Sequence, residues 1–134
     1  MTIFLDADVI IGGEKQRFDL QQWLSKNSTE SFALAATTVA ELWHGVERAT
    51  NEKQRKLRRS YLDSLFTVLP IIPYSHSTAI VHARLWAMLD KRGEMIGYYD
   101  LILSAAAVEH DCAIATFNEK HFARIPNLKV FVPK

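Results

Sequence analysis

Residues 4–11 of the chain read Phe4-Leu5-Asp6-Ala7-Asp8-Val9-Ile10-Ile11, an apolar run followed by two acidic residues and a second apolar run. The first run, extended backwards to Thr2, predicts a short buried strand over Thr2–Leu5. The second run, from Asp8 to Ile11, predicts a brief helix that Gly12-Gly13 would end. The chain therefore opens with a strand and a helix that have carboxylates between them.

Apolar segments and segments of helical periodicity alternate along the rest of the chain. Strands are predicted over residues 31–36, 68–72, 113–116 and 128–132, and helices over residues 18–27, 57–66 and 98–110. A further helix is expected to begin at a Thr37 or Thr38 cap, and another to run from a Ser75 or Ser77 cap to Gly93. This alternation predicts one α/β domain over residues 1–134, a three-layer α/β/α sandwich with a central, mostly parallel five-stranded sheet.

Composition narrows the class of protein. The 134 residues suffice for one domain, and a net charge of +1 neither demands nor excludes nucleic acid as a ligand. Cys112 is the only cysteine, so no disulfide can form within the chain. No signal peptide and no apolar run of about 18 residues is present, so we expect a cytoplasmic protein that does not span a membrane.

Acidic residues recur where the predicted strands end and helices begin. Asp6 follows the first strand, Glu41 starts the helix after the second, Asp100 starts the helix before the fourth, and Asn118-Glu119 follows the fourth. In open parallel sheets the functional crevice lies beyond the carboxyl ends of the strands. Carboxylates converging there would repel one another unless cations lay between them. Oxygen ligands favour Mg²⁺ or Mn²⁺, which can activate water and stabilise the leaving oxygen of a phosphodiester.

Each of these acids also has a purely structural interpretation. Asp6 or Asp8 could cap the short helix that follows them. Glu41 and Asp100 could simply stabilise the positive ends of their helices. Spacing alone leaves both interpretations open.

Four segments, in order, resemble the motifs of the PIN-domain family, and in particular its VapC-type toxins. The opening FLDADVII is similar to the family's first motif, an apolar strand followed by Asp-Thr-Asn. Residues 38–46, TVAELWHGV, resemble the second motif, in which a Glu precedes a Gly by four. Residues 93–107, GEMIGYYDLILSAAA, and 115–126, ATFNEKHFARIP, resemble the third motif and the closing segment.

The resemblance implies a Mg²⁺-dependent endoribonuclease, with Mn²⁺ able to substitute, that is the toxin of a type II toxin–antitoxin pair. It implies that Asp6 and Asp100 are the main metal ligands and that Glu41 is a further ligand or a base. It also implies an RNA substrate, a homodimer, and a cognate antitoxin whose peptide occupies the active-site groove. Two positions depart from the pattern. Ala7 replaces a hydroxyl residue, and Asn118 replaces a fourth Asp, so Asn118 and Glu119 are weaker candidates for metal binding.

Two other functions remain open from the sequence. Asp6 and Asp8 also fit the first motif of haloacid-dehalogenase-like phosphatases, although no matching motif follows. A PIN-like module that binds RNA or protein without catalysis is the second alternative. Among the remaining residues, His121 and the basic cluster at residues 53–59 could contact RNA, although a structural role for His121 and a solvated helix face for the cluster are the simpler interpretations.

Overall fold

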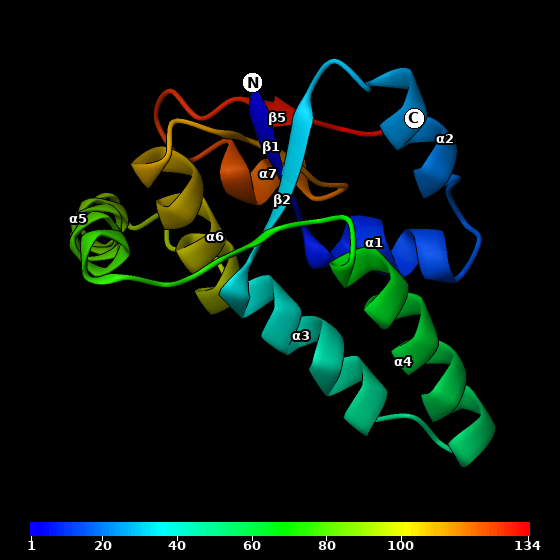
Figure 1. The fold of residues 1–134 in the computed structure, drawn as a ribbon. Helices are drawn as coiled ribbons and strands as arrows, with labels where there is room; N and C mark the ends of the chain where they lie inside the picture. Colours follow the sequence, from blue (N-terminus) through cyan, green and yellow to red (C-terminus); the bar gives the residue numbers. More distant parts are fainter.

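A sheet of five parallel strands forms the centre of the molecule, and Figure 1 labels β1, β2 and β5 among the surrounding helices. The computed structural model describes all of residues 1–134, and the strand order is β3-β2-β1-β4-β5. The strands are β1 (Thr2–Leu5), β2 (Ser31–Ala35), β3 (Ile71–Ile72), β4 (Ala113–Ala115) and β5 (Val130–Phe131). Every neighbouring pair is parallel, so the prediction of a mostly parallel sheet is confirmed and sharpened.

Helices cover both faces of the sheet because side chains alternate along each strand. On β1, Ile3 and Leu5 face one side and pack with helices α1 to α4, while Phe4 faces the other side and packs with α6 and α7. Helix α5 packs outside α6 (Figure 1). The helices are α1 (Ala7–Glu14), α2 (Leu20–Lys26), α3 (Ala36–Glu47), α4 (Glu52–Phe66), α5 (His76–Arg92), α6 (Tyr98–Glu109) and α7 (Glu119–Phe122).

The strand order reverses beside β1, because the chain first builds β2 and β3 on one side and then returns to build β4 and β5 on the other. Leu5 is level with Ala115, and the Asp6 amide donates to the Ala115 carbonyl at 3.0 Å. Asp6 and Thr116 therefore leave the sheet side by side. This switch point is where an open parallel sheet forms its crevice.

Gly12 and Gly13 do not end the first helix, as the sequence predicted, but lie inside α1. Their role is close packing rather than helix termination. A Cβ on Gly13 would come within 2.8 Å of the Leu20 Cβ and 2.7 Å of the Tyr61 hydroxyl, and one on Gly12 within 3.3 Å of the Phe117 ring. Because glycine has no Cβ, α1 can lie close to Leu20, Tyr61 and Phe117 at these two positions.

The start of α3 also differs from the prediction. The helix begins at Ala36, directly after β2, and its N-cap is Ala35, which offers no side-chain hydrogen bond. Neither Thr37 nor Thr38 is the cap, and Glu41 lies beyond the first turn instead of starting the helix. The interpretation of Glu41 as a partner of the helix dipole therefore loses its basis.

Other boundaries follow the sequence more closely. Ser75 caps α5 through a capping box with Thr78, and Gly93 ends this helix in the left-handed conformation with φ 65°. Strand β3 is shorter than predicted, because the Val68 and Leu69 amides donate back to the Leu65 carbonyl at the end of α4.

None of the helices has the length and apolar character needed to cross a bilayer.

Candidate functional site

Asp6 stands at the end of β1 with both carboxylate oxygens engaged. Its Oδ1 accepts from the Ala7 amide at 2.8 Å, which caps α1, and its Oδ2 accepts from the Thr116 hydroxyl at 2.8 Å. The residue is only 7% exposed. Burial, and then the charge of Asp8, raise the pKa of Asp6 to about 6. Asp6 therefore caps α1, as the sequence predicted, but its burial disfavours the ionised form of the carboxylate.

Asp8 lies beside Asp6 in the first turn of α1. Its Oδ2 accepts from the Phe117 amide at 3.1 Å and from the Thr116 hydroxyl at 3.4 Å. Its Oδ1 is buried and has no hydrogen-bond partner. Burial raises the pKa of Asp8 above its ordinary value. A buried carboxylate oxygen without a donor is the kind of group that a cation can satisfy.

Asp100 reaches the same region from the first turn of α6. Its Oδ2 lies 2.7 Å from Nδ1 of His121 on α7, and the Asn118 amide lies 2.9 Å from the same nitrogen. Nδ1 cannot donate to Asp100 and accept from Asn118 at once. A hydrogen bond to a charged carboxylate is the stronger of the two, so we assign the proton to Nδ1, which donates it to Asp100. The Asn118 amide is then oriented with its oxygen, not its nitrogen, toward Nδ1. His121 therefore positions Asp100.

Glu41 faces these three acids from α3. Burial raises its pKa to about 7, and the charges of Asp6, Asp100 and Asp8 contribute in that order. An electrostatic effect of this kind requires the carboxylates to be close. Side chains from α1, α3 and α6 and from the end of β1 therefore converge beyond the carboxyl ends of β1 and β4.

The carboxylates suit a hard divalent cation in chemistry, since every donor is an oxygen and they repel one another. No group of three or more His, Cys, Asp or Glu side chains, however, is close enough in this structure to hold a metal ion. The buried, unpartnered Asp8 Oδ1 and the raised pKa values of Asp6 and Glu41 are the observations that fit a cation here.

The two weaker candidates occupy the start of α7. Asn118 is the exposed N-cap of that helix, and Glu119 is exposed in its first turn. Asn118 touches the site through His121. Glu119 is not among the charges that raise the pKa of Asp6 or Glu41. Its placement fits the interpretation that it stabilises a helix terminus.

A profile of the PIN domain matches residues 3–128 of the chain. The chain belongs to the PIN-domain family. The match begins in β1 and extends past α7, so it includes every acid of the site described above. Family membership also rules out the haloacid-dehalogenase-like phosphatase.

Several PIN-domain relatives carry more specific names. Ribonuclease VapC2 of Rickettsia felis is 33% identical over 105 residues, which are 78% of this chain and 75% of that protein. Ribonuclease VapC of Rickettsia bellii is 27% identical over 130 residues, or 97% and 95% of the two chains. The crystal structure of VapBC2 from R. felis, bound to a DNA fragment from its promoter, matches at a TM-score of 0.91 and 25% identity over 100% of both chains. This PIN domain is therefore a VapC-type toxin ribonuclease, as the sequence motifs predicted.

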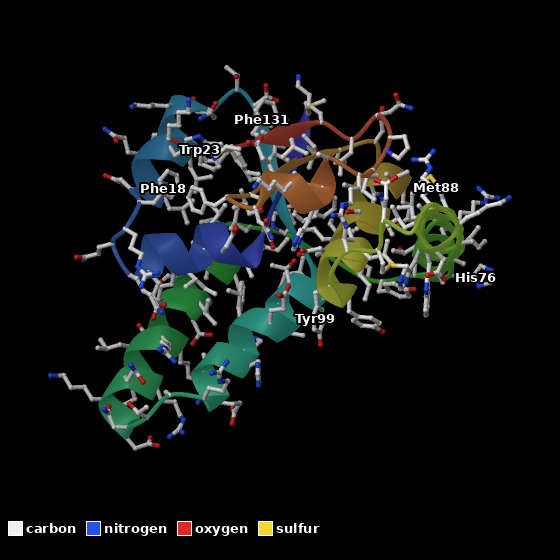
Figure 2. The ribbon with its side chains drawn as sticks, turned by 180° about the vertical axis from the view of Figure 1, so that it is seen from behind. Phe18, Trp23, His76, Met88, Tyr99 and Phe131 are labelled. Carbon is white, nitrogen blue, oxygen red and sulfur yellow. The ribbon has the colours of Figure 1, made fainter.

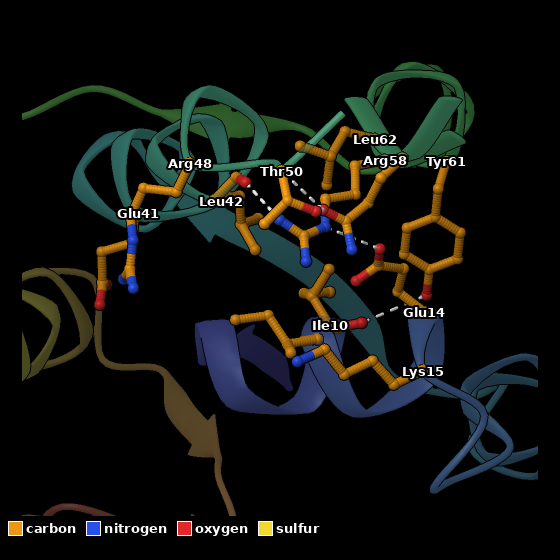
Figure 3. Close-up of a pocket in the computed structure, with 13 residues that line it drawn as sticks. Ile10, Glu14, Lys15, Glu41, Leu42, Arg48, Thr50, Arg58, Tyr61 and Leu62 are labelled. Atoms are coloured by element: carbon orange, nitrogen blue, oxygen red, sulfur yellow. Dashed lines mark hydrogen bonds and ion pairs between the residues drawn. The ribbon is translucent and has the colours of Figure 1, made fainter. Parts of the chain in front are cut away.

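A cavity of about 300 Å³ adjoins the acid site of this PIN domain between α1, α3 and α4. Figure 3 shows Glu41 and Arg48 at the end of the cavity opposite Glu14 and Tyr61. Arg58 joins its walls, because Nη1 donates to the Gly45 carbonyl at 2.7 Å and Nε lies 3.6 Å from Glu14. The cavity extends the site along α3.

Sequence reasoning did not include Asp8 and Thr116 in the site. From its sequence position Asp8 is a candidate helix cap or phosphatase acid, and Thr116 is the end of a predicted strand. A signal for both was present, since Asp8 follows Asp6 by two residues and Thr116 leaves the neighbouring strand at the same level. The strand order that makes β4 a neighbour of β1 was not known from the sequence.

Proposed function

We propose that this PIN domain is a Mg²⁺-dependent endoribonuclease whose site is formed by Asp6, Asp8, Glu41 and Asp100. The observation that carries the proposal is the convergence of these four acids beyond the carboxyl ends of β1 and β4, where Asp8 Oδ1 is buried without a hydrogen-bond partner. The raised pKa of Glu41, about 7, is consistent with that crowding. Four acids that share one crevice destabilise the fold unless a cation offsets their repulsion. Mn²⁺ is expected to substitute for Mg²⁺, because both bind oxygen ligands in octahedral geometry.

Each residue of the site has a distinct task. Asp6 and Asp100 are the main metal ligands, and Asp8 offers its unpartnered Oδ1 as a further one. Bound Mg²⁺ would polarise the scissile phosphate and lower the pKa of an attacking water. Glu41, with a pKa of about 7, can take up and release a proton near neutral pH. Thr116 fixes Asp6 and Asp8, and His121 fixes Asp100, at 2.7–3.4 Å.

A protein partner and a second copy complete the proposal. The similarity to the R. felis VapBC2 assembly supports a cognate antitoxin, and we assign its peptide to the cavity beside Glu41. The exposed aromatic side chains of Trp86, Tyr98 and Tyr99 favour a homodimer contact near the start of α6. An RNA substrate and the free thiol of Cys112 suit the cytoplasm.

Cleavage and metal binding can be tested separately. The purified protein should cut RNA with Mg²⁺ or Mn²⁺ and stop in EDTA, and Asp6→Asn and Asp100→Asn should each abolish cleavage while keeping side-chain size. Asp90→Asn, which changes an exposed acid on α5, is the matched control. Calorimetric titration with Mn²⁺ should show binding that Asp100→Asn weakens. Full cleavage by Asp6→Asn or Asp100→Asn would disprove the site.

A PIN-like module that has lost catalysis is the alternative. It is favoured by the exposed Asn118, which stands where the family pattern has a further Asp. Such a module would bind RNA or a protein partner and show no Mn²⁺ binding in the titration. Mn²⁺ binding together with cleavage would exclude it.

A further inference from the structure

A surface hollow of about 490 Å³ borders the acid site on the side of Asp8. Its lining includes Asp8, Phe18, Phe117 and the two cationic residues Arg17 and Lys134. Phe18 and Arg17 belong to the segment that joins α1 and α2, where Figure 2 shows Phe18 between these helices. The hollow therefore connects an acid of the site with residues that the proposed mechanism does not use.

Phe117 is the distinctive feature of this hollow. It remains 41% exposed although its ring is held on two sides. The ring meets Phe18 edge to face at 5.3 Å between centroids, and its Cε2 would lie 3.3 Å from a Cβ on Gly12. The Phe117 amide is fixed as well, because it donates to Asp8 Oδ2 at 3.1 Å. An aromatic ring held in place but half exposed beside a catalytic acid is suited to stacking a nucleobase.

The charges around the ring complement a nucleic-acid backbone. Arg17 and Lys134 are both exposed, and neither takes part in a salt bridge of the structure. Four acids repel a polyanionic strand, so cations beside them are needed to hold the phosphates that flank the bond to be cut. Unpaired cations next to a flat ring match the phosphate and the base of one nucleotide.

We propose that this hollow holds one nucleotide of the RNA strand next to the scissile bond, with its base stacked on Phe117 and its phosphate bound by Arg17 and Lys134. The proposal rests on the proposed function, since it assigns substrate contacts to the same site. It makes Phe117 and Arg17 substrate-positioning residues. A protein segment would also cover the ring, and the experiment below separates that case from RNA.

The test uses the full chain carrying Asp100→Asn, so that the RNA stays intact, and a short single-stranded RNA that contains 2-aminopurine. Stacking on Phe117 should quench the 2-aminopurine fluorescence. Phe117→Leu should relieve the quenching and weaken binding roughly tenfold, as expected for the loss of one base–aromatic stack, whereas Phe117→Tyr should keep both. Phe117→Leu preserves the backbone N–H that holds Asp8.

Arg17→Gln tests the phosphate contact, and an exposed side chain can be changed there without disturbing the core. It should lower the slope of log K against log salt by about 0.7 and leave the quenching in place. Lys26→Gln, on an exposed lysine of α2 outside the hollow, should change neither. Circular dichroism melts of each variant show whether the fold is kept.

The outcomes separate this proposal from the proposed function. If the wild type cuts RNA but Phe117→Leu and Arg17→Gln bind RNA as it does, the nucleotide site is wrong and the nuclease assignment stands. If Phe117→Leu alters the oligomeric state or antitoxin binding and not RNA binding, the hollow is a protein contact and the proposal is overturned. A wild type that neither binds nor cuts RNA overturns both.

Discussion

Burial governs the chemistry of Asp6 more than any single neighbour does. The residue accepts hydrogen bonds on both oxygens, which favours the charged form, and yet its pKa is raised to about 6. Desolvation outweighs those two hydrogen bonds, because the residue is only 7% exposed and the ionised carboxylate has therefore lost most of its hydration. The fold therefore carries an acid that is destabilising when ionised.

The buried carboxylate of Asp6 predicts that the stability of the fold in EDTA depends on pH. The pKa of Asp6 rises from 3.8 to about 6 on folding, and that of Glu41 from 4.5 to about 7. Within these windows the folded chain holds protons that the unfolded chain has released, so stability falls as pH rises and stays low above about 7. The contribution of Asp6 is on the order of 3 kcal/mol. The thermal midpoint should be lower at pH 8 than at pH 5.

Two comparisons check that assignment. Asp6→Asn should reduce the dependence of the midpoint on pH, because it removes one of the two titrating groups and keeps its size; the part that Glu41 contributes should remain. Mg²⁺ added at pH 8 should restore stability to the wild type and less to Asp6→Asn, since a ligand of the folded state stabilises it by mass action. A midpoint that does not change between pH 5 and pH 8 in EDTA would refute the role of burial at Asp6.

Asp8 is predicted to contribute more to catalysis than Glu119 does. Asp8 is partly buried among the acids, and Glu119 is exposed on α7. Asp8→Asn should therefore lower cleavage about 10- to 100-fold, whereas Glu119→Gln should cost less than about tenfold. Single-turnover cleavage with saturating Mg²⁺ measures both. A loss in Glu119→Gln as large as in Asp6→Asn would add Glu119 to the acids of the site and contradict this ranking.

At the scale of the helices, α1 depends on its glycines for contact with α2 and α4. A Cβ on Gly13 would come within 2.8 Å of the Leu20 Cβ, whereas one on Gly45 of α3 would meet nothing within 4 Å. Gly13→Ala should therefore destabilise the fold by about 1–3 kcal/mol through overpacking. Gly45→Ala should stabilise it by about 0.5–1 kcal/mol, because alanine favours a helix interior. Urea unfolding measures both, and equal effects would contradict the packing argument.

The arginines of the basic helix α4 make contacts within the chain. Arg55 pairs with Glu52, Arg58 joins Gly45 and Glu14, and Arg59 lies 5.7 Å from the Trp43 ring centroid. Only Lys53 and Lys56 of the predicted cluster lack a partner of this kind. The structure therefore favours an intramolecular role for the three arginines.

For the whole molecule, the sheet order determines where the acids meet. Expression alone should arrest growth, and Asp100→Asn should not, because it removes a charge from the site without changing the core. A small protein encoded beside this one should copurify and silence it. Growth curves and pull-downs measure both effects. Undisturbed growth with demonstrably folded wild-type protein would contradict the toxin assignment.

The sequence by itself determined most of the elements, and it singled out most of the acids that meet at the candidate site. Short apolar runs such as Thr2–Leu5 define buried strands, and Asp6, Glu41 and Asp100 stand at recognisable motif positions. Local signals such as Ser75 and Gly93 also set helix ends, because capping depends on neighbouring residues alone.

Only the tertiary structure decided which residues face those acids. Thr116 lies 110 residues from Asp6 and meets it because β4 pairs with β1, and no local pattern specifies that pairing. The same holds for Asp8 with Phe117 and for His121 with Asp100. Gly12-Gly13 reads as a helix end in sequence, yet the packing of Phe117 and Leu20 onto α1 keeps it helical. Long-range packing outweighs local propensity here, since the burial gained exceeds the roughly 1 kcal/mol that each glycine costs a helix.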